Sequence, residues 1–76
     1  MGNIIATIPK NARERVQIEL TEFNGHNLLA IRVFADNGAK WVPTRKGITV
    51  RAGMLPDLAA ALTAAEREAR EAGLLT

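Results

Sequence analysis

The sequence predicts an α+β domain in which four antiparallel strands are followed by one C-terminal helix. Two Asn-Gly dipeptides, Asn24-Gly25 and Asn37-Gly38, each separate stretches that are rich in β-forming residues. Asn-Gly favours a two-residue type I′ hairpin, because both central residues of that turn adopt positive φ. Beyond residue 52 the apolar spacing changes from two residues to three or four, which is typical of a helix.

The two expected turns determine which residues share a face of the sheet. Around the first turn Phe23 pairs with His26, and around the second Phe34 pairs with Trp41. One face, here called the aliphatic face, then contains Val16, Ile18, Leu20, Leu29, Ile31, Val33 and Val42. The other, the aromatic face, carries Arg15, Gln17, Glu19, Thr21, Phe23, His26, Leu28, Ala30, Arg32, Phe34 and Trp41. A slip of one residue would exchange the two sets, and only this register gives an unbroken aliphatic face, which we expect to be the core.

The strands are expected at residues 14–23, 26–35, 39–43 and 47–50, with residues 44–46 as a tight connection. Ile48 and Val50 join the aliphatic face in this scheme, and Thr49 points away from it. Residues 1–13 form an N-terminal lead, in which isoleucines at positions 4, 5 and 8 predict a short strand that ends at Pro9. Residues 14–76 are then a single ββββα domain.

The helix has one continuous apolar stripe and an Ala-rich centre, both of which favour helix formation. Pro56 fits the first turn, and Gly73 is suited to the position after the last turn, so the helix is expected to end near Ala72. The stretch 58–65 is apolar around most of its circumference, which predicts burial on more than one side. The predicted second partner is the same helix of another subunit in a C₂ homodimer. The expected interface consists of Leu55, Leu58, Ala61, Leu62 and Ala65. The alternative is that the alanines only favour helix formation.

The composition argues against several classes of protein. A chain of 76 residues without cysteine has no disulfide, thiolate metal ligand or thiol nucleophile. With one histidine and no grouping typical of catalysis, we expect no metal, no cofactor, no small-molecule substrate and no enzymatic activity. No segment approaches the roughly 20 apolar residues that span a bilayer, so we expect no membrane association and a cytoplasmic location.

The charge is distributed unevenly along the chain. Residues 1–51 contain eight basic and four acidic side chains, whereas residues 52–76 contain two basic and four acidic ones. This asymmetry favours a polyanionic partner at the sheet. If the helix covers the aliphatic face, the aromatic face stays open, and aromatic residues interleaved with arginines are typical of binding to single-stranded nucleic acid. Two alternatives remain: Phe34 and Trp41 pack mainly on each other, and His26 is a solvated residue without a function.

Three stretches read together resemble the C-terminal single-stranded-DNA-binding domain of the transcriptional coactivator "positive cofactor four" family, in a compact bacterial or phage-type form. The stretches are Phe23-Asn24-Gly25, Leu29-Ala30-Ile31-Arg32 and Trp41-Val42-Pro43-Thr44-Arg45-Lys46-Gly47-Ile48. The resemblance extends over about residues 15–62. It implies a curved four-stranded sheet, a C-terminal helix that forms the dimer, and preference for single-stranded or melted DNA.

The resemblance also implies roles for individual residues. Phe23 lies where the family has a base-stacking aromatic, Arg32 where it has a phosphate-binding arginine, and Arg45 with Lys46 where it has a basic pair. The chain departs from the family at Asn24 and His26, where lysines are frequent, and at Ala35, where the family has a tryptophan that Phe34 or Trp41 replaces here. The long Ser-rich and acidic tail of animal members is absent from this sequence.

The sequence therefore predicts a homodimeric, non-enzymatic protein that binds single-stranded DNA with little sequence specificity in transcription regulation or on unwound DNA, in a bacterium at the nucleoid. The transcription machinery is a further expected partner. The residues predicted to contact DNA are Arg15, Phe23, His26, Arg32, Phe34, Trp41, Arg45 and Lys46. Two alternatives remain, a single-stranded RNA-binding protein or RNA chaperone, and a protein-interaction dimer that binds no nucleic acid.

Overall fold

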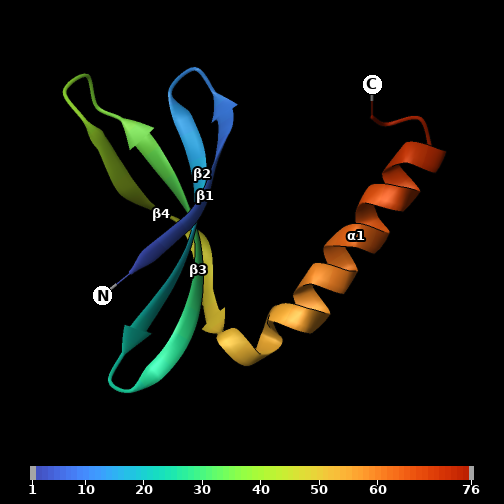
Figure 1. The fold of residues 1–76 in the computed structure, drawn as a ribbon. Helices are drawn as coiled ribbons and strands as arrows, with labels where there is room; N and C mark the ends of the chain where they lie inside the picture. The colour runs from blue at the N-terminus through green and yellow to red at the C-terminus, as the bar shows by residue number, and fades with distance from the viewer. Residues whose placement is uncertain (1, 76) are drawn as a thin grey trace.

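The computed structural model describes residues 2–75 and shows one antiparallel sheet followed by a helix (Figure 1). The strands are β1 (Asn3–Asn11), β2 (Glu14–Phe23), β3 (His26–Asp36) and β4 (Trp41–Arg51), which pair in the order β1-β2-β3-β4. A 3-10 turn, η1 (Ala52–Met54), leads into α1 (Leu55–Glu71). The predicted ββββα fold class is confirmed.

The first hairpin has the predicted register along its whole length. Phe23 pairs with His26 at the turn, and Arg15 pairs with Phe34 at the far end. Asn24 and Gly25 have φ values of 52° and 79°, as a type I′ turn requires. The division of β2 and β3 into an aliphatic and an aromatic face is therefore confirmed.

The second connection differs from the prediction. Trp41 lies opposite Asp36, not Phe34, and Phe34 pairs with Pro43. The Asn37 side chain accounts for the longer loop, because its Oδ1 accepts hydrogen bonds from the backbone N–H groups of Ala39 and Lys40, at 2.9 Å each. This Asx-type arrangement replaces the tight turn. The shift is an even number of residues, so Trp41 stays on the aromatic face.

The predicted break at residues 44–46 is also wrong, because β4 is one strand that contains a bulge. The register changes between the pairs Phe34–Pro43 and Arg32–Gly47, which leaves extra residues on β4. The Thr44 hydroxyl donates a hydrogen bond of 2.7 Å to the carbonyl of Val33, so that group stays satisfied without a regular ladder partner. Beyond the bulge Ile48 pairs with Ile31, and alternation places it on the aliphatic face as predicted.

The lead contributes a full strand to the sheet. β1 continues through Pro9, which pairs with Arg15, so the expected stop at this proline is wrong. Because β1 is an edge strand, the missing N–H of Pro9 costs little. The expected domain boundaries at residues 1 and 76 lie outside the described residues.

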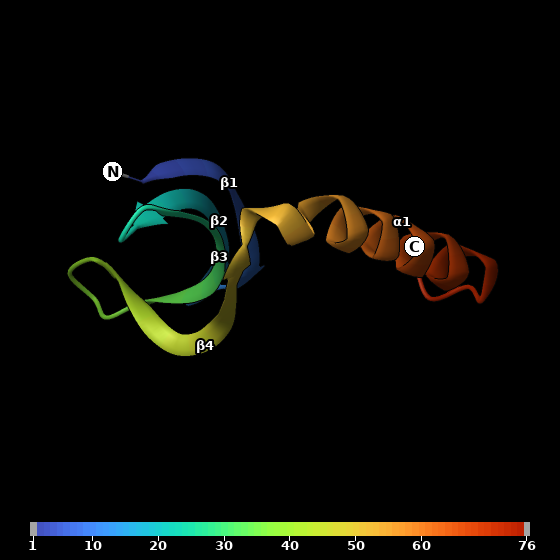
Figure 2. The same ribbon diagram turned by 90° about the horizontal axis from the view of Figure 1, so that it is seen from below.

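The sheet is curved, and α1 projects away from it (Figures 1 and 2). Figure 2 shows the helix on the outer side of the curve. Gln17 of the aromatic face is 9% exposed, whereas Ile8 and Ile48 of the aliphatic face are 50% and 51% exposed. Because side chains crowd on the inner side of a curved sheet, the aromatic face lines the inside of the curve.

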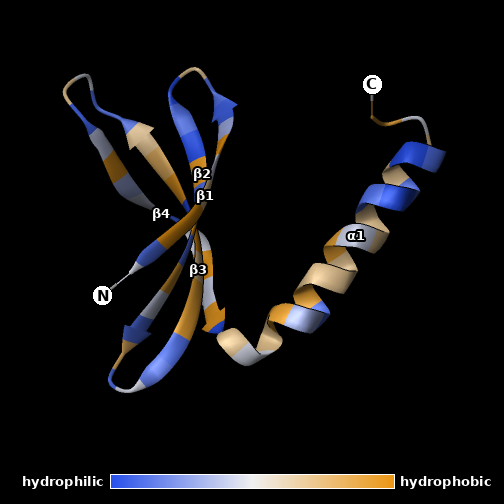
Figure 3. Cartoon of the chain, in the orientation of Figure 1, coloured by the Kyte–Doolittle hydropathy of each residue, from blue (hydrophilic) through white to orange (hydrophobic). Residues whose placement is uncertain are grey.

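The expectation that α1 covers the aliphatic face is wrong. The helix ends as predicted, with Ala72 at the C-cap and Gly73 at a φ of 74°. Yet its apolar first half lies clear of the strands (Figure 3), and Leu62 is 60% exposed. Within residues 2–75, Leu29 is the one buried hydrophobic side chain, and it is still 3% exposed. A single subunit therefore has very little core.

Candidate nucleic-acid interface

One end of the aromatic face brings Arg15, Phe34 and Trp41 together. Arg15 on β2 pairs with Phe34 on β3, and Trp41 enters from the start of β4. The Arg15 guanidinium carbon lies 4.3 Å from the centre of the Trp41 ring, the geometry of a cation–π contact. The Arg15 Nε is buried and has no hydrogen-bond partner among residues 2–75. The planar face and the terminal nitrogens of a guanidinium are suited to a base or a phosphate of a ligand.

Arg32 lies at the middle of the aromatic face and is held by β4. Its Nη1 donates a hydrogen bond of 3.0 Å to the Thr44 carbonyl, and its Nη2 lies 3.5 Å from the Thr49 hydroxyl. The residue directly opposite is Gly47, which has no side chain to cover the guanidinium. The β4 bulge thus positions the half-buried Arg32 through a backbone group.

Phe23 and His26 lie at the other end of the same face. They pair across the first turn, and both are exposed, Phe23 to 66%. Phe23 lies at the end of the hairpin, next to the turn, so its phenyl ring points into solvent. An exposed ring in this position is available for stacking.

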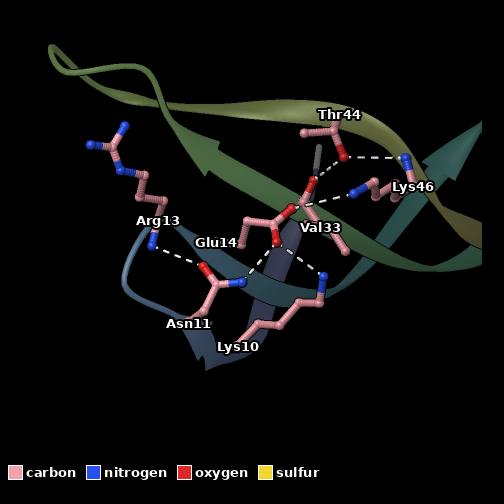
Figure 4. Close-up of polar contacts among 7 residues, drawn as sticks. All are labelled: Lys10, Asn11, Arg13, Glu14, Val33, Thr44 and Lys46. Carbon is pink, nitrogen blue, oxygen red and sulfur yellow. Dashed lines mark hydrogen bonds and ion pairs between the residues drawn. The ribbon is translucent and has the colours of Figure 1, made fainter.

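The predicted basic pair Arg45 and Lys46 is divided between the two faces. Alternation from the Arg32–Gly47 pair puts Arg45 on the aromatic side and Lys46 on the aliphatic side. Lys46 Nζ lies 3.6 Å from a carboxylate oxygen of Glu14, which alternates with Val16 on the aliphatic face (Figure 4). The structure therefore does not bring Lys46 together with the predicted site arginines.

Glu14 joins three strands at this end of the sheet. Its Oε1 accepts hydrogen bonds from the Asn11 amide at 2.8 Å and from Lys10 Nζ at 3.0 Å, and its other oxygen faces Lys46 (Figure 4). The Asn11 hydrogen bond, followed by the contact with Lys10 and by Lys46, lowers the pKa of Glu14 to about 2. This carboxylate stays ionised at neutral pH and holds both lysines on the aliphatic side.

The sequence interpretation missed Arg51, which is a further residue of the aromatic face. Arg51 pairs directly with Leu28, which places a further cation beside the Phe23 end. Counting two residues on from Thr49 would have found it, but the predicted strand stopped at residue 50. Gln17, which was predicted on this face, pairs with Arg32 and is only 9% exposed. It is therefore a buried polar residue of the aromatic face.

The five predicted interface residues of α1 remain accessible in one subunit. Leu55 and Leu58 are half-buried, and Ala61, Leu62 and Ala65 are exposed. Leu62 is 60% exposed among residues 2–75, so the predicted contact surface is accessible to another chain.

Other kinds of site find no support in the described part of the chain. Residues 2–75 contain no group of three or more metal-ligating side chains. Within the same range, the helix is too short and too polar to cross a bilayer.

Comparison with known proteins gives a consistent result. The family model described as Transcriptional Coactivator p15 (PC4) matches residues 10–61. A search of curated protein sequences gives no match.

Solved structures of homologues are similar to almost the whole chain. The tetragonal crystal form of a PC4 homologue from Burkholderia pseudomallei is 30% identical, covers 87% of this chain and 98% of its own, and superposes with a TM-score of 0.77. The orthorhombic form gives 32% identity, coverage of 88% and 92%, and a TM-score of 0.79. The bacteriophage T5 homologue of PC4, implicated in recombination-dependent DNA replication, shares the fold at 21% identity, with coverage of 97% and 83% and a TM-score of 0.64.

Proposed function

Because this chain belongs to the transcriptional coactivator p15 (PC4) family, we propose that it is a homodimer that binds single-stranded DNA with little sequence preference. It acts on melted or unwound DNA in transcription regulation, in the cytoplasm and without catalysis. The observation that carries the proposal is the open aromatic face, which presents an exposed ring at one end and an Arg–Trp stack at the other.

The bases stack at both ends of this face. Phe23 offers a free ring, and stacking of a base on an aromatic ring is worth about 1–3 kcal/mol. At the other end Arg15 covers one side of Trp41, so a base meets the guanidinium plane there rather than that side of the indole. Phe34, half-buried beside Arg15, completes this end, and His26 flanks Phe23.

Four arginines neutralise phosphates along the path: Arg15, Arg32, Arg45 and Arg51. Lys46 binds Glu14 on the other side of the sheet, so it reaches a phosphate only by giving up that ion pair. Backbone contacts of this kind carry no sequence information, which accounts for the low specificity.

The exposed helix supports the proposed homodimer. A subunit in which Leu29 is the one buried hydrophobic residue of the described range needs further apolar burial to be stable. The stripe that contains Leu58 and Leu62 supplies that surface when it packs on a second copy.

A pair of alanine variants tests the stacking role. Phe23→Ala removes the exposed ring of the aromatic face, and Ile8→Ala removes a half-exposed apolar side chain on the aliphatic side of β1 as a matched control. The affinity for a labelled oligothymidine, measured by fluorescence anisotropy, should fall about 5- to 150-fold for Phe23→Ala. The control should bind like the wild type. Equal affinity of both variants would refute stacking at the first hairpin.

A further inference from the structure

The chain beyond α1 holds one exposed leucine in a defined position. Gly73 adopts a positive φ of 74°, and the Leu74 N–H donates a hydrogen bond of 2.8 Å to the Ala69 carbonyl, which closes a Schellman-type cap. Leu74 nevertheless remains 73% exposed. It borders a shallow hollow of about 410 Å³ whose other walls include Ala65, Ala69 and Ala72. A large apolar side chain is thus fixed by the backbone but not covered.

The apolar stripe of α1 is self-complementary in the antiparallel direction. When two copies cross at Leu62, Leu55 of each lies opposite Ala69 of the other, and Leu58 lies within one residue of Ala65. Large side chains then meet small ones on both sides of the central Leu62 pair, which allows close packing. A parallel arrangement would instead place leucine on leucine at one end and alanine on alanine at the other.

The helix dipoles favour the same direction. In an antiparallel pair the two dipoles are opposed, whereas in a parallel pair they are aligned and like ends meet. The side-chain charges do not add to this preference, because residues 66–71 contain Glu66, Glu68 and Glu71 beside Arg67 and Arg70.

A cavity of about 510 Å³ lies at the opposite end of α1, between the helix start and the first hairpin. Its walls include Leu20 and Glu22 of β2, Asn27 of β3, and Ala52 with Leu55. In the antiparallel register Ala69 lies beside Leu55 of the other copy. Leu74, which is capped onto Ala69, lies near the same place. The exposed leucine and the open cavity therefore meet.

We propose that Leu74 of each subunit docks into the cavity beside Leu55 of its partner, so that the C-terminal cap of one chain locks onto the first hairpin of the other. This inference rests on the proposed homodimer and specifies its direction, its register and a contact outside the helix stripe. The docked leucine also connects each helix to the partner's sheet, since Leu20 and Asn27 belong to the hairpin that carries Phe23.

Cysteine cross-linking tests the docking directly, because the natural chain has no cysteine. Leu55→Cys and Leu74→Cys are made separately, mixed, oxidised and analysed on non-reducing gels. Within one chain the two positions are separated by the whole helix, roughly 25 Å at 1.5 Å per residue, so a disulfide between them must join two subunits. The mixture should give a cross-linked dimer, and each single variant alone should not.

Other cross-linking patterns contradict the docking. Self-linking of Leu55→Cys alone or of Leu74→Cys alone would show a parallel pair. A wild-type dimer in light scattering without a 55–74 cross-link in the mixture would reject the docking and leave the homodimer intact. A monomeric wild type would overturn both, whereas loss of oligonucleotide binding alone would contradict the proposed function and leave the docking in place.

A substitution pair checks that the contact stabilises the dimer. Leu74→Ser should raise the dimer dissociation constant at least about a hundredfold, because symmetry removes two buried leucines. Leu75→Ser is the matched control, since Leu75 is the adjacent exposed leucine and borders neither cavity. An equal effect of both substitutions in sedimentation equilibrium would reject the specific role of Leu74.

Discussion

Glu14 connects β1, β2 and β4 through a single carboxylate. Since folding lowers its pKa from 4.5 to about 2, the ionised form stabilises the folded chain above about pH 4.5. That contribution is lost as the pH falls from 4.5 towards 2, because protonation removes the acceptor for Lys10 and Asn11.

Glu14→Gln tests this at the residue scale. The variant should melt below the wild type at neutral pH, and the difference in Tm should shrink as the pH is lowered through the window from 4.5 to 2. Thermal melts followed by circular dichroism measure it. Glu71→Gln, which removes an exposed carboxylate at the end of α1, controls for the change in net charge. A Tm difference for Glu14→Gln that does not vary with pH would contradict the assigned role.

The β4 bulge is the element that positions the aromatic face. Gly47 has a φ of 148°, and a Cβ at this position would overlap the Ile31 carbonyl oxygen and lie 2.8 Å from the Arg32 Cα. The two backbones approach so closely that only glycine fits. Arg32, whose guanidinium reaches the Thr44 carbonyl, depends on this geometry.

Gly47→Ala should therefore destabilise the fold by about 1–3 kcal/mol or more. Urea unfolding compares it with Gly53→Ala, where an added Cβ meets nothing within 4 Å and φ is not positive. The control should unfold close to the wild type. Similar unfolding midpoints for both variants would mean that β3 and β4 are not held as closely as described.

The elements also show where sequence patterns suffice. Asn24-Gly25 predicts its hairpin because the turn requires positive φ at both positions, and Asn and Gly tolerate it. The register of ten residue pairs follows from this turn. The same dipeptide at Asn37 misleads, because the asparagine side chain bonds two later N–H groups and lengthens the loop. Thr44 misleads in a similar way, since its hydroxyl replaces a ladder bond that period-two patterns assume.

The residues of the candidate site could be predicted where their strands are regular, and not where a strand is irregular. Residues on the regular strands, such as Arg15, Phe23 and Arg32, are on the predicted face because alternation determines it. Lys46 lies in the bulge and Arg51 beyond it. Their faces were not predicted, because the expected strand covered only residues 47–50. The position of α1 could not be predicted from the apolar periodicity. That periodicity identifies the apolar side of the helix, but it does not show whether this side packs on the same chain or on another one.

At the scale of the whole molecule, the aromatic face is one path between two stacking ends. Phe23 and Arg15 are eight residues apart on β2, which is about 26 Å along a strand. A strand of DNA with stacked bases covers this distance in about eight nucleotides, and a stretched one in fewer. The path is inside a curved sheet, so it suits a flexible single strand better than a stiff duplex, whose bases are not available for stacking.

The central claim, that this face binds single-stranded DNA through four arginines and stacked bases, is tested most directly by one salt series. Affinities for a single-stranded oligonucleotide and for the duplex of the same sequence are measured over a range of salt concentrations. The account predicts tighter binding of the single strand throughout, with log affinity falling against log salt at a slope of about −2.8 per site for four neutralised phosphates. Equal binding of the duplex, or affinity that does not change with salt, would contradict it.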